Sequence, residues 1–191
     1  MKIALNSLAA AAIAVMVGLG SAALALRYPI ETDWVRSGAW KTNLEAGSSQ
    51  AGIYSRGRIA VAGLFALNKS ETIYFLAEHD DDGRAMSSRC DYRIEGKDFN
   101  ARWWSITAYG PTFFLIPNQL NRYSYNMNNL ARDAQGNYVI RLSSAPKDMN
   151  WLPSGNAPRV YLNLRLYNPD PSTAKDPAAV ETPRIIREAC R

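Results

Sequence analysis

The sequence has only one histidine, His79, which excludes most of the usual catalytic and metal-binding arrangements. A Ser-His-Asp triad would have to use His79, which stands beside three consecutive aspartates rather than in an apolar segment. A zinc site would need further close-spaced ligands, and the two cysteines do not form a C-x-x-C pair. The folded part also lacks a G-x-S-x-G motif and a glycine-rich phosphate loop. The sequence therefore predicts no catalytic residue, no metal and no cofactor.

Basic residues are in slight excess, but they are not clustered. Lys and Arg number 22 against 17 Asp and Glu, and the arginines are scattered from Arg27 to Arg191 without a basic run. A nucleic-acid-binding protein would gather such charge on one surface. We therefore expect no nucleic-acid partner.

Residues 78–83 gather four acidic side chains around His79. Carboxylate oxygens are calcium ligands, but the twelve-residue calcium loop with its terminal Glu is missing. Asp and Gly are also the residues typical of a tight hairpin turn. We interpret this segment as a solvated turn.

Residues 3–26 contain no charged side chain, and Lys2 and Arg27 flank them. As a helix this segment would be about 36 Å long, enough to cross a bilayer core. We favour a retained signal-anchor over residues 1–26, with the remaining chain on the periplasmic side of the inner membrane. The alternative is a cleaved signal peptide, because residues 23–25 (Ala-Leu-Ala) resemble a cleavage site. Both alternatives export the remaining chain.

The only two cysteines are Cys90 and Cys190. An even number in an exported chain favours a disulfide, and a bridge near a chain end would restrain that end. The alternative is two unrelated thiols. We predict the Cys90–Cys190 bond.

The folded part is predicted to be mainly β. Residues 27–52 are expected to be a connector whose tryptophans pack on the domain, and residues 53–67 have apolar side chains at helical spacing. Alternating or β-branched segments bounded by turn residues predict strands at residues 72–79, 90–94, 102–109, 112–116, 122–127, 138–142 and 160–167. This pattern predicts an antiparallel β-sandwich or jelly-roll-like domain over residues 53–191, with one packed helix.

Several short blocks resemble one bacterial family, domain-of-unknown-function family 1214. They are Tyr-Phe-Leu at 74–76, Trp-Trp-Ser-Ile-Thr-Ala-Tyr at 103–109, Asn-Arg-Tyr-Ser at 121–124, Asn-Trp-Leu-Pro at 150–153 and Leu-Arg-Leu-Tyr-Asn-Pro at 164–169. Their order and spacing fit from about residue 72 to residue 171. The resemblance implies a jelly-roll-like sandwich that follows a second domain in longer relatives, whereas here a membrane segment takes that place. The family name implies no agreed activity.

The same blocks supply the candidate ligand-binding residues, in which arginines stand among aromatic side chains: Trp104, Tyr109, Arg122, Tyr123, Trp151, Arg165 and Tyr167. An Arg surrounded by Trp and Tyr can hold a carboxylate or a sugar ring through bidentate hydrogen bonds and stacking. The preferred interpretation is nevertheless structural, since Tyr and Trp also fill sandwich cores and Arg stems cover apolar surface.

Three functional hypotheses remain open at this level. The first is a non-catalytic envelope protein that binds an unidentified envelope ligand or protein. The second is a hydrolase or lyase acting on an envelope carbohydrate or small acid, because carboxylate separation cannot be read from sequence. The third is a subunit whose sheet edge pairs with a partner strand.

Export is directly testable. A reporter enzyme that is active only outside the cytoplasm, fused after Arg191, is expected to be active, because residues 3–26 direct the chain across the membrane. The matched control is the same fusion with two leucines of this segment changed to Arg, which should abolish reporter activity. Activity of a cytoplasm-only reporter at the same position would contradict the prediction.

Overall fold

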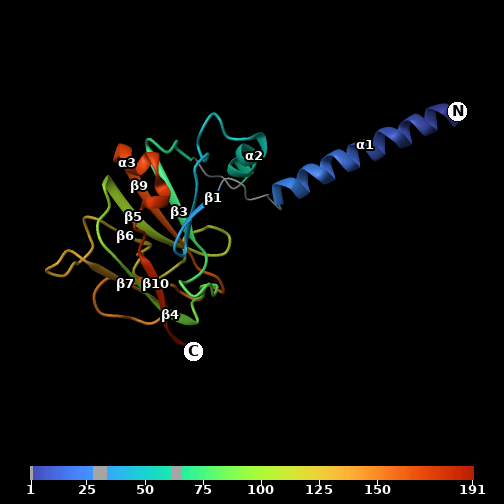
Figure 1. Ribbon diagram of the computed structural model, residues 1–191. Helices are drawn as coiled ribbons and strands as arrows, with labels where there is room; N and C mark the ends of the chain where they lie inside the picture. Colours follow the sequence, from blue (N-terminus) through green and yellow to red (C-terminus); the bar gives the residue numbers. More distant parts are fainter. Residues whose placement is uncertain (1, 28–33, 62–65) are drawn as a thin grey trace.

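The computed structural model describes residues 2–27, 34–61 and 66–191. Its first element is α1 (Lys2–Arg27), whose segment Asn6–Leu26 is long and apolar enough to cross a membrane. The side chains of residues 6–24 are exposed, and Figure 1 shows the helix outside the two sheets. The predicted apolar N-terminal helix is therefore present, and it suits a membrane anchor or a signal segment.

In the described part of the chain, ten strands form two sheets. The larger sheet has the order β1 (Trp34–Ser37), β2 (Trp40–Asn43), β3 (Thr72–Ala77), β9 (Tyr161–Pro169), β5 (Ala101–Tyr109) and β6 (Ser124–Asn126). The smaller has the order β10 (Arg184–Cys190), β4 (Cys90–Gly96), β7 (Tyr138–Ser143) and β8 (Trp151–Pro153). Neighbouring strands are antiparallel except β7 and β8, which are parallel. The mainly β class is confirmed, and the arrangement fits the predicted sandwich.

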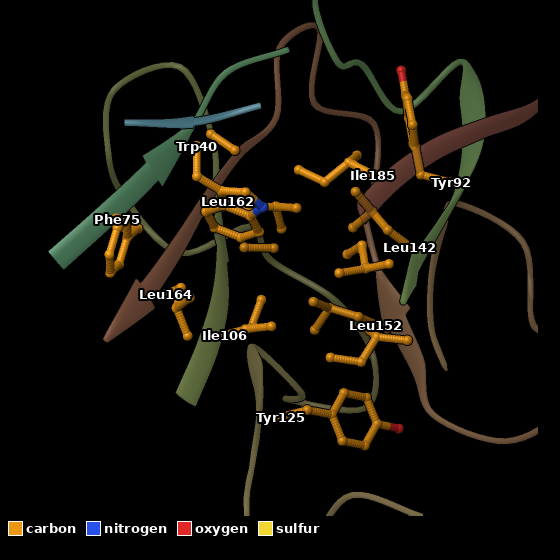
Figure 2. Packing of buried hydrophobic residues seen from close by; sticks show 14 of the residues in the cluster. Trp40, Phe75, Tyr92, Ile106, Tyr125, Leu142, Leu152, Leu162, Leu164 and Ile185 are labelled. Atoms are coloured by element: carbon orange, nitrogen blue, oxygen red, sulfur yellow. The ribbon is translucent and has the colours of Figure 1, made fainter. Parts of the chain in front are cut away.

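The core lies between the two sheets and follows the two-residue period of the strands. On β9, Leu162, Leu164 and Leu166 are fully buried and alternate with half-buried side chains. Figure 2 shows leucines of β9 facing Leu142 and Ile185 of the smaller sheet. Burying such a side chain contributes roughly 1.5–3 kcal/mol relative to exposure, so this alternation fixes which face of β9 points inward.

The segment expected to be a connector supplies two strands. β1 and β2 form a hairpin, and β2 pairs with β3 at the edge of the larger sheet. Trp40 is fully buried, and its indole Nε1 donates a hydrogen bond to the carbonyl oxygen of Pro183 at 2.6 Å. Packing of this segment on the domain is thus observed, but its strands were not predicted. Only four residues long each, they lack a clear apolar alternation.

The predicted helix over residues 53–67 is present but shorter. α2 runs from Ile53 to Val61, residues 62–65 lie outside the described residues, and residues 66–67 are not helical. Ile53 is 80% exposed and Tyr54 is 59% exposed. No described α2 side chain belongs to the core cluster, and the apolar residues 62–65 lie outside the described residues, so packing of the predicted helix stays a prediction.

A second correction concerns residues 112–116, which were predicted to be a strand. Here only Leu115 forms a β-bridge, to Tyr109, within a turn that follows Gly110. Phe113 has a positive φ of 59°, which is incompatible with an extended strand. After β9 the chain forms a short helix, α3 (Pro171–Lys175), and a 3-10 turn, η1 (Pro177–Ala179), before it returns as β10.

The chain end is fixed to the smaller sheet by a disulfide and two ion-pair clusters. β10 pairs with β4 so that Cys190 lies opposite Cys90, and the two are bonded as predicted. The carboxylate of Asp80 is buried and accepts a hydrogen bond from Arg187 Nε at 2.7 Å. Asp91 accepts one from Ser143 Oγ at 2.7 Å and forms ion pairs with Lys147 and Arg191. Each of these bonds joins β4 or its preceding loop to a segment distant in sequence.

Removing the disulfide should weaken the domain without changing its fold. Cys190→Ala is expected to lower the free energy of unfolding by about 2–4 kcal/mol, because the bond chiefly restricts the unfolded chain. Urea unfolding followed by tryptophan fluorescence measures the change. Reductant should shift the unmodified protein by a similar amount and leave Cys190→Ala unaffected. Equal stability of the oxidised protein and the variant would contradict the prediction.

Protonation of Asp91 in acid should lower the free energy of unfolding. Burial opposes ionisation of its carboxyl, but hydrogen bonds from Lys147 and Ser143 and the charge of Arg191 outweigh burial and lower its pKa below the ordinary 3.8. The stabilisation is therefore present above pH 3.8 and is lost as the pH falls through the lower folded-state pKa. Asp91→Asn should reduce the loss of unfolding free energy that occurs as the pH is lowered, whereas Asp148→Asn, at an exposed position, should not. An identical loss in the two variants would be inconsistent with this role.

Candidate functional site

The candidate site lies on the outer face of the larger sheet, opposite the core. The alternation that turns the β9 leucines inward turns Asn163, Arg165 and Tyr167 outward. The strand register places Arg165 between Tyr74 of β3 and Ser105 of β5. Arg165 therefore occupies the middle of a six-stranded sheet, with strands on both sides of it.

The guanidinium of Arg165 is held along β5 by two neutral oxygen atoms. It donates one hydrogen bond to Thr107 Oγ1 at 3.2 Å and another to the Tyr109 hydroxyl at 2.6 Å. The guanidinium carbon also lies 5.5 Å from the centre of the Tyr109 ring. These contacts fix the direction of the planar group before any ligand binds.

Arg165 has no carboxylate partner among the residues that the structure describes. Its side chain is half-buried, so its charge is less well solvated than that of an exposed arginine. A guanidinium has five N–H donors, and neutral acceptors in the protein take two of them here. An anion could take the remaining donors and would balance the charge.

Aromatic rings lie on both sides of this arginine along the strands. The Trp103 and Tyr167 rings contact each other with their centres 5.3 Å apart, one same-face position from Arg165. On the other side Tyr161 pairs with Tyr109 across the strands, and Tyr161 stacks on Phe113 at 5.0 Å. These half-buried or exposed rings offer flat apolar surface next to a positive charge, an arrangement that can hold a ring bearing a carboxylate.

Trp104, a sequence candidate, lies on the opposite face of β5 from this cluster. It is fully buried, its indole Nε1 donates to Asp98 Oδ1 at 3.0 Å, and its ring stacks on Tyr138. Its environment is that of a core residue with a satisfied polar atom. The structure therefore separates Trp104 from Tyr109, Arg165 and Tyr167, which share the outer face.

Three further candidates lie at a different place, near β6 and β8. Arg122 donates a hydrogen bond to the carbonyl oxygen of Trp151 at 3.1 Å, and the Tyr125 hydroxyl donates to the same oxygen at 3.2 Å. Burial raises the pKa of Tyr125, which keeps its hydroxyl protonated as a donor. Tyr123 instead contacts Asn121. These bonds tie the two sheets together at one end, so Arg122 and Trp151 have a bracing role.

A cavity of about 970 Å³ lies beside this brace, with Trp151 and Pro153 in one wall. Its other wall is the segment after β5, in which Phe114 is 77% exposed and Leu115 is 42% exposed. The preceding residue, Phe113, has the positive φ that bulky side chains rarely adopt. The cavity is mainly apolar, unlike the cluster around Arg165.

Comparison with known proteins places this geometry in a family. The family model described as "Protein of unknown function (DUF1214)" matches residues 71–171, more than half of the 191-residue chain. This chain belongs to that family. The match covers β3 to β9, and therefore both the Arg165 cluster and the Arg122–Trp151 brace. Membership confirms the resemblance seen in the sequence blocks.

Two solved structures are similar to the chain. A protein of Vibrio parahaemolyticus is 26% identical, with a TM-score of 0.58, over 73% of this chain and 36% of its own. An uncharacterised protein of Burkholderia cenocepacia is 16% identical, with a TM-score of 0.46, over 89% of this chain and 40% of its own. This chain thus spans about a third of the Vibrio protein. No curated protein matches.

The description of the family names no activity, and the chemistry of the site follows from its own residues. Alternation along β5 puts Thr107 and Tyr109 on one face, but it gives no sign that both would bind Arg165. That contact depends on the register between β5 and β9, strands separated by more than fifty residues. A long-range register of this kind leaves no local signal in the sequence.

Proposed function

We propose that this protein is a non-catalytic, membrane-anchored binding module of the cell envelope. We further propose that the face around Arg165 binds a ligand carrying a carboxylate on a ring, such as an acidic sugar or an aromatic acid. The observation that carries the proposal is a half-buried guanidinium whose only described polar partners are neutral oxygens. An ionised ligand group would supply the missing opposite charge.

The proposed location rests on two features. The apolar helix α1 is suited to anchor or export the chain, and the Cys90–Cys190 bond is typical of proteins folded in an oxidising compartment. Together they favour a domain on the periplasmic side of the inner membrane, with α1 as its anchor. The membrane is then the one partner implied by the sequence itself.

Binding is favoured over the hydrolase or lyase alternative by the cavities. A hydrolase of this kind would place convergent carboxylates in a concave site. The cavity beside the Arg122–Trp151 brace has no Asp or Glu among its described lining residues, and neither has a second cavity between β4 and the end of β10. Arg165 likewise lies beside hydroxyl groups rather than a general acid, an environment suited to holding an anion.

The proposal is tested by titrating the full chain in nanodiscs with uronic acids and benzoate. Trp103 lies next to Arg165 on the same face, so its fluorescence should report occupancy. Arg165→Ala should weaken carboxylate binding on the order of tenfold or more, because the charged donor is lost. Arg165→Lys should bind less well than the parent, since it keeps the charge but loses the planar fork.

The matched control is Arg102→Ala, which removes the same charge from an exposed position on β5. It should bind within about twofold of the parent. Neutral analogues, in which an amide replaces the carboxylate, should not distinguish Arg165→Ala from the parent. Carboxylate binding that is unchanged in Arg165→Ala, or absent from the parent across the panel, would refute the proposal.

A further inference from the structure

A second cavity, of about 510 Å³, lies where the C-terminal end of β10 meets β4. Figure 1 shows the C-terminal end of β10 beside β4. Three segments form its walls: the loop before β4, the loop before β9 and the end of β10. Four arginines line it, namely Arg89, Arg159, Arg187 and Arg191. We call it the arginine cleft.

Two of these arginines have no compensating charge. Neither Arg89 nor Arg159 has a side-chain hydrogen bond or ion pair within the part of the chain that the structure describes, and both are exposed. No acidic residue appears among the described residues that line the cleft. The cleft therefore presents at least two free guanidinium groups to solvent.

The floor of the cleft is rigid. Arg187 donates from Nε to the buried Asp80 at 2.7 Å and from a terminal nitrogen to the carbonyl oxygen of Ala85 at 2.9 Å. Its guanidinium also lies 5.5 Å from the centre of the Tyr92 ring. The Cys90–Cys190 bond joins two further lining residues, so the wall from β10 cannot move away from β4. A preorganised floor lowers the entropic cost of binding.

We propose that the arginine cleft binds a phosphoryl group. A single carboxylate carries one charge and two oxygens, which one guanidinium satisfies. A phosphate monoester or diphosphate carries about two or more charges and at least three acceptor oxygens, which match several guanidinium forks converging from different segments. The cleft volume is that of a small-molecule site. This site shares no residue with the Arg165 face and does not depend on its function.

Pyrophosphate is the probe, titrated by calorimetry into the full chain in phosphatidylcholine nanodiscs. The unmodified protein should bind it at one saturable site. The double variant Arg89→Ala/Arg159→Ala should weaken binding on the order of tenfold or more, because two charged donors are removed. Both side chains are exposed, so the variant should fold normally, as circular dichroism will show.

Two controls separate the cleft from general charge and from the Arg165 face. Arg184→Ala removes the same charge from β10 at a position outside the cleft, where the side chain is 71% exposed, and should change affinity less than about twofold. Arg165→Ala should also leave pyrophosphate binding unchanged. No saturable binding by the parent, or equal affinity of the parent and the double variant, would overturn the inference.

The phosphoryl group could belong to a soluble compound or to a lipid headgroup, and vesicles distinguish the two. Retention of the nanodisc-held protein on vesicles containing phosphatidic acid, a phosphate monoester, competed by pyrophosphate and lost in the double variant, would identify a headgroup. Pyrophosphate binding without vesicle retention would identify a soluble ligand. Vesicle retention that persists in the double variant would show that the cleft is not the lipid contact and would count against the headgroup arm.

Discussion

The two-residue period of β9 is the constraint on which both the core and the candidate site depend. Its leucines fill the space between the sheets, and the same alternation leaves Arg165 and Tyr167 on the outer face. β9 is also paired on both sides, to β3 and to β5, so its register is fixed twice. A slip of one residue would bury a guanidinium in the core at a cost of several kcal/mol, which makes the placement of Arg165 a direct consequence of packing.

The smaller sheet is held together in a different way. β10 contributes Ile185 to the core, but the outer part of that strand is fixed by polar and covalent bonds. Asp80 and Asp91 each neutralise arginines from the chain end, and burial of Asp80 makes its pair sensitive to loss of either partner. β10, which follows a Pro-rich segment, is therefore held in place by charged residues and a disulfide, and apolar alternation in the sequence does not identify these.

Sequence reasoning succeeded where local alternation was strong and failed where structure depends on distant pairing. β3, β5, β7 and β9 were predicted because each combines alternation with β-branched or aromatic residues and turn residues at its ends. β1 and β2 were missed because strands of four residues at a sheet edge carry little pattern. The apparent strand at 112–116 has strand-like composition, but the positive φ of Phe113 breaks it.

The candidate site shows the same division. Tyr109, Arg165 and Tyr167 could be placed on one face from alternation, but Trp104 was included although its parity sets it on the other. Arg122 and Trp151 are 29 residues apart in the sequence. The Arg122 guanidinium donates a hydrogen bond to the backbone carbonyl of Trp151, and no sequence pattern predicts this contact. The arginines of the cleft were read only as scattered charge, because three separate segments bring them together.

Location and surface chemistry are linked through one covalent bond. Cys90 and Cys190 line the arginine cleft, and their bond holds β10, with Arg187, against β4. Disulfides persist mainly in oxidising compartments, and the proposed export by α1 would place the domain in one, where the cleft keeps this fixed wall. In a reducing compartment the chain end would be free to fray, and Arg191 would leave Asp91 with Lys147 as its remaining ion-pair partner. Under the proposed periplasmic placement, α1 would bring the domain to a compartment in which the disulfide can hold the arginines in place.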